Sequence, residues 1–237
     1  MGCFGAAAAY SFGRRKSPTG GEGGMLVTNH RAVFERAVVA SQHPVRQHKE
    51  LSRSRSFMLS EFGFNFRMHP LAAVAVRAGL DSLRETLVRR RAFWTRLSAA
   101  LTTCPGIHAP EVGADSEPAY FQYCPRFAPH ELGLPVLARD RFVEALVAEG
   151  VPIAADPIGT PLHCRSTEPW GRNLASPRAF PASEDRCYQT GLSLAPWLAS
   201  LEASSVVDGV AAAILKVVAR ADALVPWGVA HGTSRSS

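Results

Sequence analysis

The sequence predicts an α/β protein, and three observations lead to that prediction. Short apolar segments bounded by glycine or proline alternate with longer segments in which apolar residues recur every three or four positions. The chain has 237 residues, of which 46% are hydrophobic and 19% are charged, so it can bury a substantial core. No apolar run reaches the length needed to cross a bilayer. We therefore expect a globular protein of mixed helices and strands.

The first part of the chain predicts two strands joined by a tight loop. Residues 3–12 are small and apolar, end in Tyr10 and Phe12, and suit a buried strand. The sequence GGEGG then supplies a turn before a second strand in MLVTN, residues 25–29. We expect Asn29 to cap a helix over 31–40, where Val33, Ala37 and Ala40 form an apolar stripe.

The rest of the chain predicts helices that alternate with short strands. Residues 41–60 have no periodicity and are rich in basic side chains, which indicates a long basic loop. Pro70 suits the start of a long helix whose leucines continue to Leu101, where Pro105 and Gly106 prevent its continuation. The further expected elements are a strand over 120–127, a helix over 137–150, a strand over 151–155, an irregular segment over 159–185 and an amphipathic helix over 201–223.

Charge and cysteine content restrict the possible functions. The net charge is +6, which favours an anionic partner. Nucleic acid is disfavoured, because aromatic residues are not interleaved with the charges of the basic loop. Five widely spaced cysteines without a Cys-x-x-Cys pair argue against a disulfide framework and against a zinc site, so we expect no metal and a cytoplasmic protein. The N-terminus matches neither a signal peptide nor a myristoylation motif.

Two sets of basic residues have both a functional and a structural interpretation. Arg46, Arg53 or Arg55 could face an anionic substrate such as a nucleotide-sugar pyrophosphate, or could belong to a solvated loop. His163, in the sequence PLH, could contact a substrate or could be a hydrogen-bonded structural histidine.

One lysine stands out by its position. Only three of the 26 basic residues are lysines, and Lys16 lies in SFGRRKSPTGGEGG, between the first predicted strand and the glycine turn. A solvated surface charge is one interpretation. The other is a nucleophile, because a desolvated lysine amine can form a Schiff base with an aldehyde cofactor. Ser11, at the end of the preceding strand, could then hydrogen-bond a phosphate.

These residues resemble a known family. The spacing of Ser11, Phe12 and Lys16 before GEGG, together with GFNFRM at residues 63–68, resembles the pyridoxal phosphate-dependent sugar aminotransferases of the DegT/StrS type. The resemblance extends from residue 1 to about residue 220, more loosely at PLH and at LSLAPW, residues 192–197.

The resemblance implies a cofactor, a site and a partner. Lys16 would hold pyridoxal 5'-phosphate covalently, Ser11 would bind its phosphate, and Asn65 would reach the phosphate in the neighbouring subunit of a homodimer. The reaction would move an amino group, from glutamate or another amino-acid donor, to a keto-sugar or keto-cyclitol. Relatives with histidine at the lysine position dehydrate instead, so Lys16 favours transamination.

The resemblance also implies that this chain corresponds to the C-terminal part of a fold-type-I enzyme. Residues 1–69 would complete the large cofactor-binding domain, and residues 70–237 would form a linking helix and the small domain. The family places an aspartate, which pairs with the pyridine nitrogen, before the segment that aligns with Met1. Two alternatives follow: an aminotransferase whose front half is missing from this sequence, or a truncated, non-catalytic remnant that pairs with an intact relative.

Overall fold

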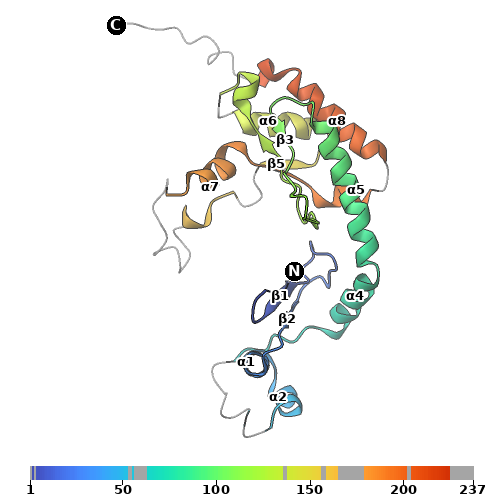
Figure 1. Cartoon of the computed structure of the whole chain (residues 1–237), viewed down its shortest axis with the longest axis vertical. Helices are drawn as coiled ribbons and strands as arrows, with labels where there is room; N and C mark the ends of the chain where they lie inside the picture. Colours follow the sequence, from blue (N-terminus) through green and yellow to red (C-terminus); the bar gives the residue numbers. More distant parts are fainter. Residues whose placement is uncertain are drawn as a thin grey trace. The chain divides into compact units, whose positions relative to one another are not determined.

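The structure is a computed structural model that describes residues 2, 4–52, 55, 63–135, 138–155, 159–164, 179–201 and 204–224 (Figure 1). The chain divides into two compact units, Met1–Thr86 and Leu87–Ser237. The division into domains 1–69 and 70–237 stays a prediction. Within the described ranges, no helix combines the length and the apolar character that a membrane span requires.

The first unit opens with a β-hairpin, as the sequence predicted. Strand β1 (Ala8–Ser11) pairs antiparallel with β2 (Gly24–Val27), and Ser11 lies opposite Gly24. The expectation that the first strand is buried was wrong, because Ala9, Tyr10 and Ser11 are exposed, and all four residues of β2 are exposed as well. Among the described residues this sheet has only two strands, so most of its surface stays accessible to solvent.

Two helices follow the hairpin, where the sequence predicted one helix and a loop. Helix α1 (Arg31–Ser41) has His30, not Asn29, at its N-cap position, and no side chain makes a capping hydrogen bond there. Helix α2 (Pro44–Glu50) occupies part of the expected basic loop. The buried apolar residues of this region are Val38, Val39 and Leu51, and not the predicted Val33, Ala37 and Ala40.

The expected long helix is two helices. Helix α4 (Pro70–Asp81) begins at the predicted proline, and α5 (Leu83–Leu101) ends at the predicted leucine. Ser82 separates them: its hydroxyl donates to the carbonyl of Gly79 at 3.4 Å, and its own carbonyl accepts from Thr86 N at 3.0 Å. Serine side chains compete for backbone groups in this way, which explains the interruption.

The second unit holds the main core. Strand β3 (Ile107–His108) pairs with β4 (Arg126–Phe127), and β5 (Ile153–Ala155) pairs with β6 (Leu192–Leu194), both antiparallel. Helices α6 (Ala138–Ala148) and α8 (Ser204–Val218) confirm two predicted helices. The expected strand over 120–127 is shorter than predicted. Shorter helical elements are η1 (Pro129–Leu132), η2 (Leu162–Cys164), α7 (Pro181–Asp185), η4 (Arg186–Thr190), η5 (Pro196–Ser200) and η6 (Ala221–Leu224).

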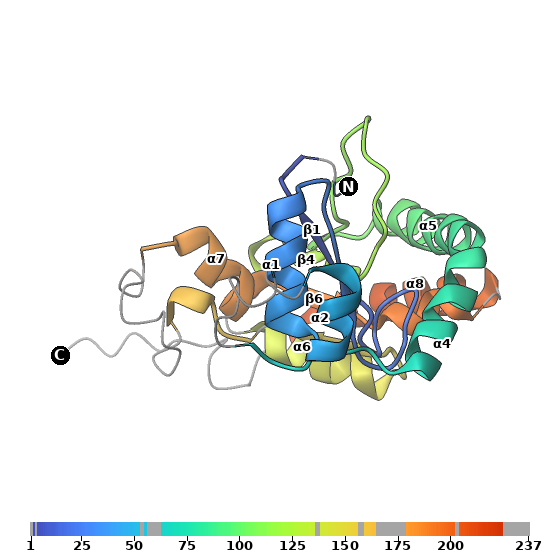
Figure 2. The same cartoon turned by 90° about the horizontal axis from the view of Figure 1, so that it is seen from below.

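Aromatic and aliphatic side chains from α5, α6, α8 and the strands fill this core. Trp94 stacks on Tyr123 with ring centroids 4.5 Å apart, and Phe127 stacks on Phe142 at the same distance. The predicted apolar face of α8 is buried, which confirms its amphipathic pattern. Helices α5 and α8 lie side by side (Figures 1 and 2), and Arg96 binds Asp208 across them at 2.8 Å. Burial of this kind supplies most of the stabilisation of a domain.

Candidate functional site

Lys16 lies in the loop between β1 and β2, and backbone hydrogen bonds fix the base of that loop. Phe12 N donates to the carbonyl of Gly23, and Gly20 N donates to the carbonyl of Phe12, both at 2.9 Å. Lys16 N donates to the carbonyl of Gly13 at 2.8 Å, so the lysine ends a tight turn immediately after the strand. The side chain of Phe12 is buried beneath this turn, and Lys16 is half-buried.

Two hydroxyl groups organise the two ends of the loop. Thr19 Oγ1 donates to the carbonyls of Phe12 and Gly13, at 3.2 and 3.1 Å, and accepts from Gly21 N at 3.0 Å. Ser11 Oγ accepts from Gly13 N at 3.4 Å and is exposed at the end of β1. The start of the loop therefore combines an exposed hydroxyl, at Ser11, with a backbone turn that ends at Lys16.

The loop also packs against helix α4, and this contact requires a glycine. A Cβ atom on Gly79 would lie 2.7 Å from Cβ of Pro18, closer than carbon atoms approach in proteins. The missing side chain at Gly79 lets the helix and the lysine loop touch directly. The loop is thus held on one side by the hairpin and on the other by α4.

Asn65 lies on a different support, the end of α1. Phe64 N and Phe66 N donate to the carbonyls of Ala40 and Ser41, each at 2.7 Å, so residues 64–66 follow the last turn of α1. Gly63 permits the approach, because a Cβ there would lie 2.8 Å from the carbonyl oxygen of Val39.

The orientation of the Asn65 side chain is fixed by a neighbour. Arg67 Nε donates to Asn65 Oδ1 at 2.9 Å. On the two sides of Asn65 in the sequence, Phe64 and Phe66 are 62% and 68% exposed, and their rings stack with centroids 5.2 Å apart. Ser11 and Lys16 therefore lie in one hairpin, whereas Asn65 lies in the segment that is hydrogen-bonded to the last turn of α1. The role of all three in cofactor binding stays a prediction.

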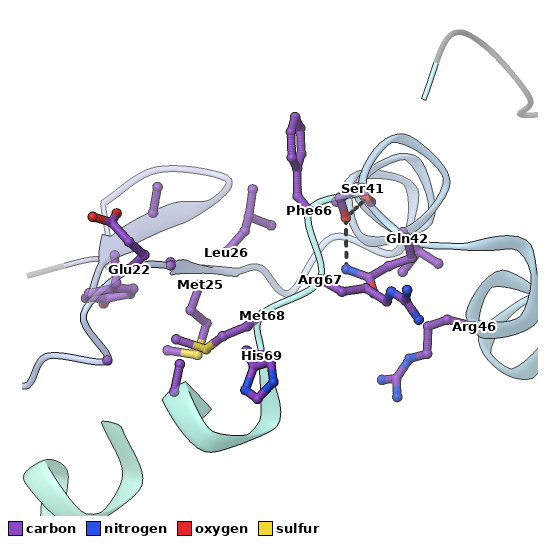
Figure 3. A pocket seen from close by; sticks show the side chains of 18 of the residues that line it. Glu22, Met25, Leu26, Ser41, Gln42, Arg46, Phe66, Arg67, Met68 and His69 are labelled. Carbon is purple, nitrogen blue, oxygen red and sulfur yellow. Dashed lines mark hydrogen bonds between the residues drawn. The ribbon is translucent and has the colours of Figure 1, made fainter. Parts of the chain in front are cut away.

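A groove in the first unit, which sequence reasoning did not find, lies between these supports (Figure 3). The glycine turn, α1 and the segment before α4 form its walls, and neither Lys16, Ser11 nor Asn65 lines it. Met25, Leu26 and Met68 give it an apolar side, and Arg46, Arg67 and His69 give it a basic side. The only sequence signal for it was that GEGG and FRM, which line it, belong to the two recognised motifs.

The candidate substrate arginines have different surroundings. Arg46 lines the groove, but it also binds Glu50 on its own helix at 2.7 Å. Arg55 binds the buried carboxylate of Glu35 at 2.7 Å, and Arg31 binds the same carboxylate at 2.8 Å. Hydrogen bonds from Arg31 and then Arg55 lower the pKa of Glu35. Arg55 is therefore a structural ion-pair partner, and Arg53 lies outside the described residues.

His163, in the second unit, has a structural partner. Its Nε2 atom lies 2.9 Å from Glu184 Oε1, and only 7% of the histidine side chain is exposed. This contact agrees with the interpretation of His163 as a hydrogen-bonded structural residue.

Comparison with known proteins decides the family. The model of the DegT/DnrJ/EryC1/StrS aminotransferase family matches residues 1–212. The chain belongs to this family. The match begins before the Lys16 loop and continues into α8, so it includes both supports of the candidate site.

Individual members of the family are similar over different parts of the chain. EpsN of Bacillus subtilis, named as a candidate pyridoxal phosphate-dependent aminotransferase, is 34% identical over 48% of this chain and 28% of its own length. A candidate L-glutamine:3-amino-2,3-dideoxy-scyllo-inosose aminotransferase of Streptoalloteichus tenebrarius is 28% identical over 94% of this chain and 56% of its own length.

Solved structures of aminotransferases show the same fold. The aminotransferase from Psychrobacter cryohalolentis superposes with a TM-score of 0.72 at 20% identity, over 94% of this chain and 58% of the other chain. The likeness confirms the predicted α/β class and the fold-type-I aminotransferase architecture. The chain spans little more than half the length of these two relatives, which it matches over 94% of its own length.

Proposed function

We propose that this chain carries the cofactor lysine of a pyridoxal phosphate-dependent aminotransferase that transfers an amino group from an amino-acid donor, such as glutamate, to a keto-sugar or keto-cyclitol. The observation that supports the proposal most is the placement of Lys16. The lysine lies five positions after Ser11, the last residue of β1, in a loop that the hairpin hydrogen bonds and the Gly79 contact hold in place. Family membership supplies the chemical context.

The residues present fit the cofactor. Lys16 offers an amine that can bond covalently to an aldehyde, and the exposed Ser11 hydroxyl can donate to a phosphate oxygen while its oxygen keeps the bond from Gly13 N. When bound, pyridoxal phosphate supplies a ring that withdraws electrons from the substrate carbon. The Lys16 amine, once released by an incoming amino group, can accept and return a proton at Nζ.

The proposed substrate class comes from the relatives. The Streptoalloteichus protein is named for a cyclitol ketone and a glutamine donor, and GDP-perosamine synthase of Escherichia coli O157:H7, 30% identical over 38% of this chain, is named for a nucleotide sugar. Both names concern a polyhydroxylated ring, which supports a keto-sugar or keto-cyclitol as the proposed substrate class. The basic side of the groove, with Arg46 and Arg67, would suit a substrate that carries an anionic group.

We place the second half of each site in a neighbouring subunit. Asn65 is exposed and is flanked by two large exposed aromatic rings, a surface that is suited to burial against a second copy of the chain. The described cysteines form no disulfide bond, which is compatible with a cytoplasmic homodimer.

The experiment that tests the proposal is covalent capture at Lys16. The purified chain is incubated with pyridoxal phosphate, reduced with borohydride and digested, and the peptides are analysed by mass spectrometry. We expect a phosphopyridoxyl group on the peptide that contains Lys16, and no such group in Lys16→Ala. Lys49→Ala and Lys216→Ala are matched controls that should keep the modification at Lys16.

The assay has a second arm, because the relatives are about twice as long as this chain. The chain is fused to the segment of the Streptoalloteichus relative that precedes the matched region, and the reduction is repeated. Modification of Lys16 in either arm supports the proposal. An unmodified Lys16 in both arms, with the fusion shown to be folded by circular dichroism, overturns it.

A further inference from the structure

A cluster of three metal-ligating side chains lies in the second unit, in the half of the chain that does not carry Lys16. His163 and Cys164 come from η2, and Glu184 comes from α7. The two short helices lie beside each other in Figures 1 and 2. One ligand atom from each side chain can be chosen so that all three lie within 4.8 Å of one another.

The geometry of the cluster is close to that of a metal site. Four ligands placed tetrahedrally around zinc, at about 2.0–2.3 Å, are separated by roughly 3.3–3.8 Å. His163 Nε2 and Glu184 Oε1 are 2.9 Å apart. To bind one zinc ion, these two atoms would have to move further apart by less than about 1 Å. All three residues are half-buried, and the side chains of His163 and Glu184 are only 7% and 16% exposed, so the ligands are partly shielded from water.

The choice of donors indicates the ion. A thiolate, an imidazole and a carboxylate together are typical of zinc, whereas calcium and magnesium take oxygen ligands. A thiolate and a carboxylate carry two negative charges, which a divalent cation neutralises. Neutralisation of this kind lowers the cost of keeping both anions in a partly buried site.

Neighbouring side chains support the arrangement. The ring of Phe180 meets the His163 imidazole edge-on, with centroids 4.9 Å apart, and this contact fixes the plane of the imidazole. The Tyr188 side chain contacts the Cys164 thiol. Both contacts restrict the positions of two of the three side chains.

We propose that His163, Cys164 and Glu184 form a zinc site that ties η2 to α7, with water in the fourth position. The proposal does not depend on the proposed aminotransferase function. The spacing rule for cysteines did not reveal the site, because its ligands come from two segments about twenty residues apart that only the fold brings together.

Cobalt replaces zinc as a spectroscopic probe in the test. The full chain, purified without a histidine tag and treated with a chelator, is titrated with Co²⁺. We expect one equivalent to produce a thiolate-to-cobalt charge-transfer band in the near ultraviolet, and Zn²⁺ to displace it. Zinc binding should also release a proton from the thiol, which a pH indicator can measure.

Single substitutions then assign the ligands. Cys164→Ser should abolish the charge-transfer band. His163→Ala and Glu184→Gln should each weaken zinc binding by more than about 100-fold, because the loss of a ligand costs more affinity than the loss of a residue that only supports a ligand. Cys124→Ser, which removes another half-buried thiol of the same unit, should leave both the band and the affinity unchanged.

Three outcomes would overturn the proposal. The first is the absence of a charge-transfer band when Co²⁺ is in excess over the folded chain. The second is a band that survives Cys164→Ser, and the third is a band that disappears equally in Cys124→Ser. Because Cys164→Ser changes a single atom, it is expected to remain folded, and circular dichroism of each variant checks this.

Discussion

At the scale of single residues, Glu131 shows how one carboxylate can hold a turn. Its Oε1 lies 2.7 Å from His108 Nε2, and its Oε2 accepts from Gly106 N at 3.1 Å. Glu131 belongs to η1, whereas Gly106 lies in the turn between α5 and β3 and His108 is the last residue of β3. The hydrogen bond from His108, and then that from Gly106, lower the pKa of Glu131, against an opposing effect of burial.

The lowered pKa predicts how stability depends on pH. The charged carboxylate stabilises the folded state above the ordinary glutamate pKa of 4.5, and this contribution disappears as the pH falls through the lowered value. Glu131→Gln should therefore reduce the melting temperature near pH 7, and the difference from wild type should shrink on acidification below pH 4.5. Thermal unfolding followed by circular dichroism over this range measures it.

A matched variant separates this contact from the general effect of charge. Glu111→Gln removes an exposed carboxylate from the same unit. A similar pH-dependent loss in Glu111→Gln would contradict the assignment to Glu131.

Residues differ in how much the sequence reveals about them. Ser11, Lys16 and Asn65 could be proposed as site residues because each lies in a contiguous motif whose spacing is recognisable. The contacts between Glu131 and His108, and between His163 and Glu184, join residues 23 and 21 positions apart through irregular segments. Periodicity carries no information about such pairs, so only the structure could supply them.

At the scale of elements, two helices begin in the same way. His43 precedes Pro44 at the start of α2, and His69 precedes Pro70 at the start of α4. In each, the histidine Nδ1 accepts from the backbone N–H two residues later, at 3.3 and 3.2 Å. Histidine thus takes the role that serine or aspartate usually has at a helix start.

This arrangement predicts the effect of changing His69. His69→Ala leaves the Leu71 N–H without its acceptor and should lower the free energy of unfolding by about 1 kcal/mol. His69→Asn supplies an oxygen acceptor and should retain most of the stability. Urea unfolding followed by circular dichroism compares the two, and equal losses in both variants would show that the histidine ring, not the cap, is required.

Two helical glycines should respond oppositely to alanine. Gly209, in α8, has no atom within 4 Å of its virtual Cβ, so Gly209→Ala should stabilise the protein by about 1 kcal/mol through helix propensity. Gly79, in α4, faces Pro18, so Gly79→Ala should destabilise it by about 1–2 kcal/mol through overpacking. The same urea experiment measures both changes.

The Gly79 substitution also tests the support of the lysine loop. If α4 positions the loop, Gly79→Ala should reduce the borohydride capture at Lys16, and Gly209→Ala should not. Unchanged capture in Gly79→Ala would show that the hairpin alone positions Lys16.

Elements were predicted well where they are long and periodic. The helices at 138–148 and 204–218 agree with their apolar repeats. Helix α2 has only seven residues and buries no side chain, so it leaves no apolar period to detect. Pro44 stands at its start as Pro70 stands at the start of α4, but only Pro70 was used to predict a helix.

At the scale of the whole molecule, the exposed surfaces of the first unit indicate where another polypeptide could pack. The hairpin exposes Met25, Leu26 and Val27, each by nearly half, and the Asn65 segment exposes two phenylalanines. Exposed apolar surface of this extent is typical of an interface. This agrees with the proposal that Asn65 completes a site whose lysine belongs to another subunit.

A shared site makes a quantitative prediction about mixed dimers. The experiment uses whichever form binds the cofactor, the chain alone or the fusion. In that form, the Lys16→Ala and Asn65→Ala variants should each lose most of the cofactor during gel filtration. After the two variants are unfolded and refolded together, half of the dimers should be mixed, and each mixed dimer regains one intact Lys16 and Asn65 pair. The mixture should retain about one quarter of the wild-type cofactor, because one of two sites is intact in half of the dimers.

The alternative geometry gives a different number. If Asn65 served the lysine of its own chain, every site in every dimer would carry one substitution, and the refolded mixture would retain only the mean of its two parents. Each variant refolded alone provides that baseline, and analytical ultracentrifugation confirms that dimers have formed. Retention at the parental mean in verified dimers would contradict the shared site while leaving the covalent role of Lys16 intact, since borohydride capture tests that role separately.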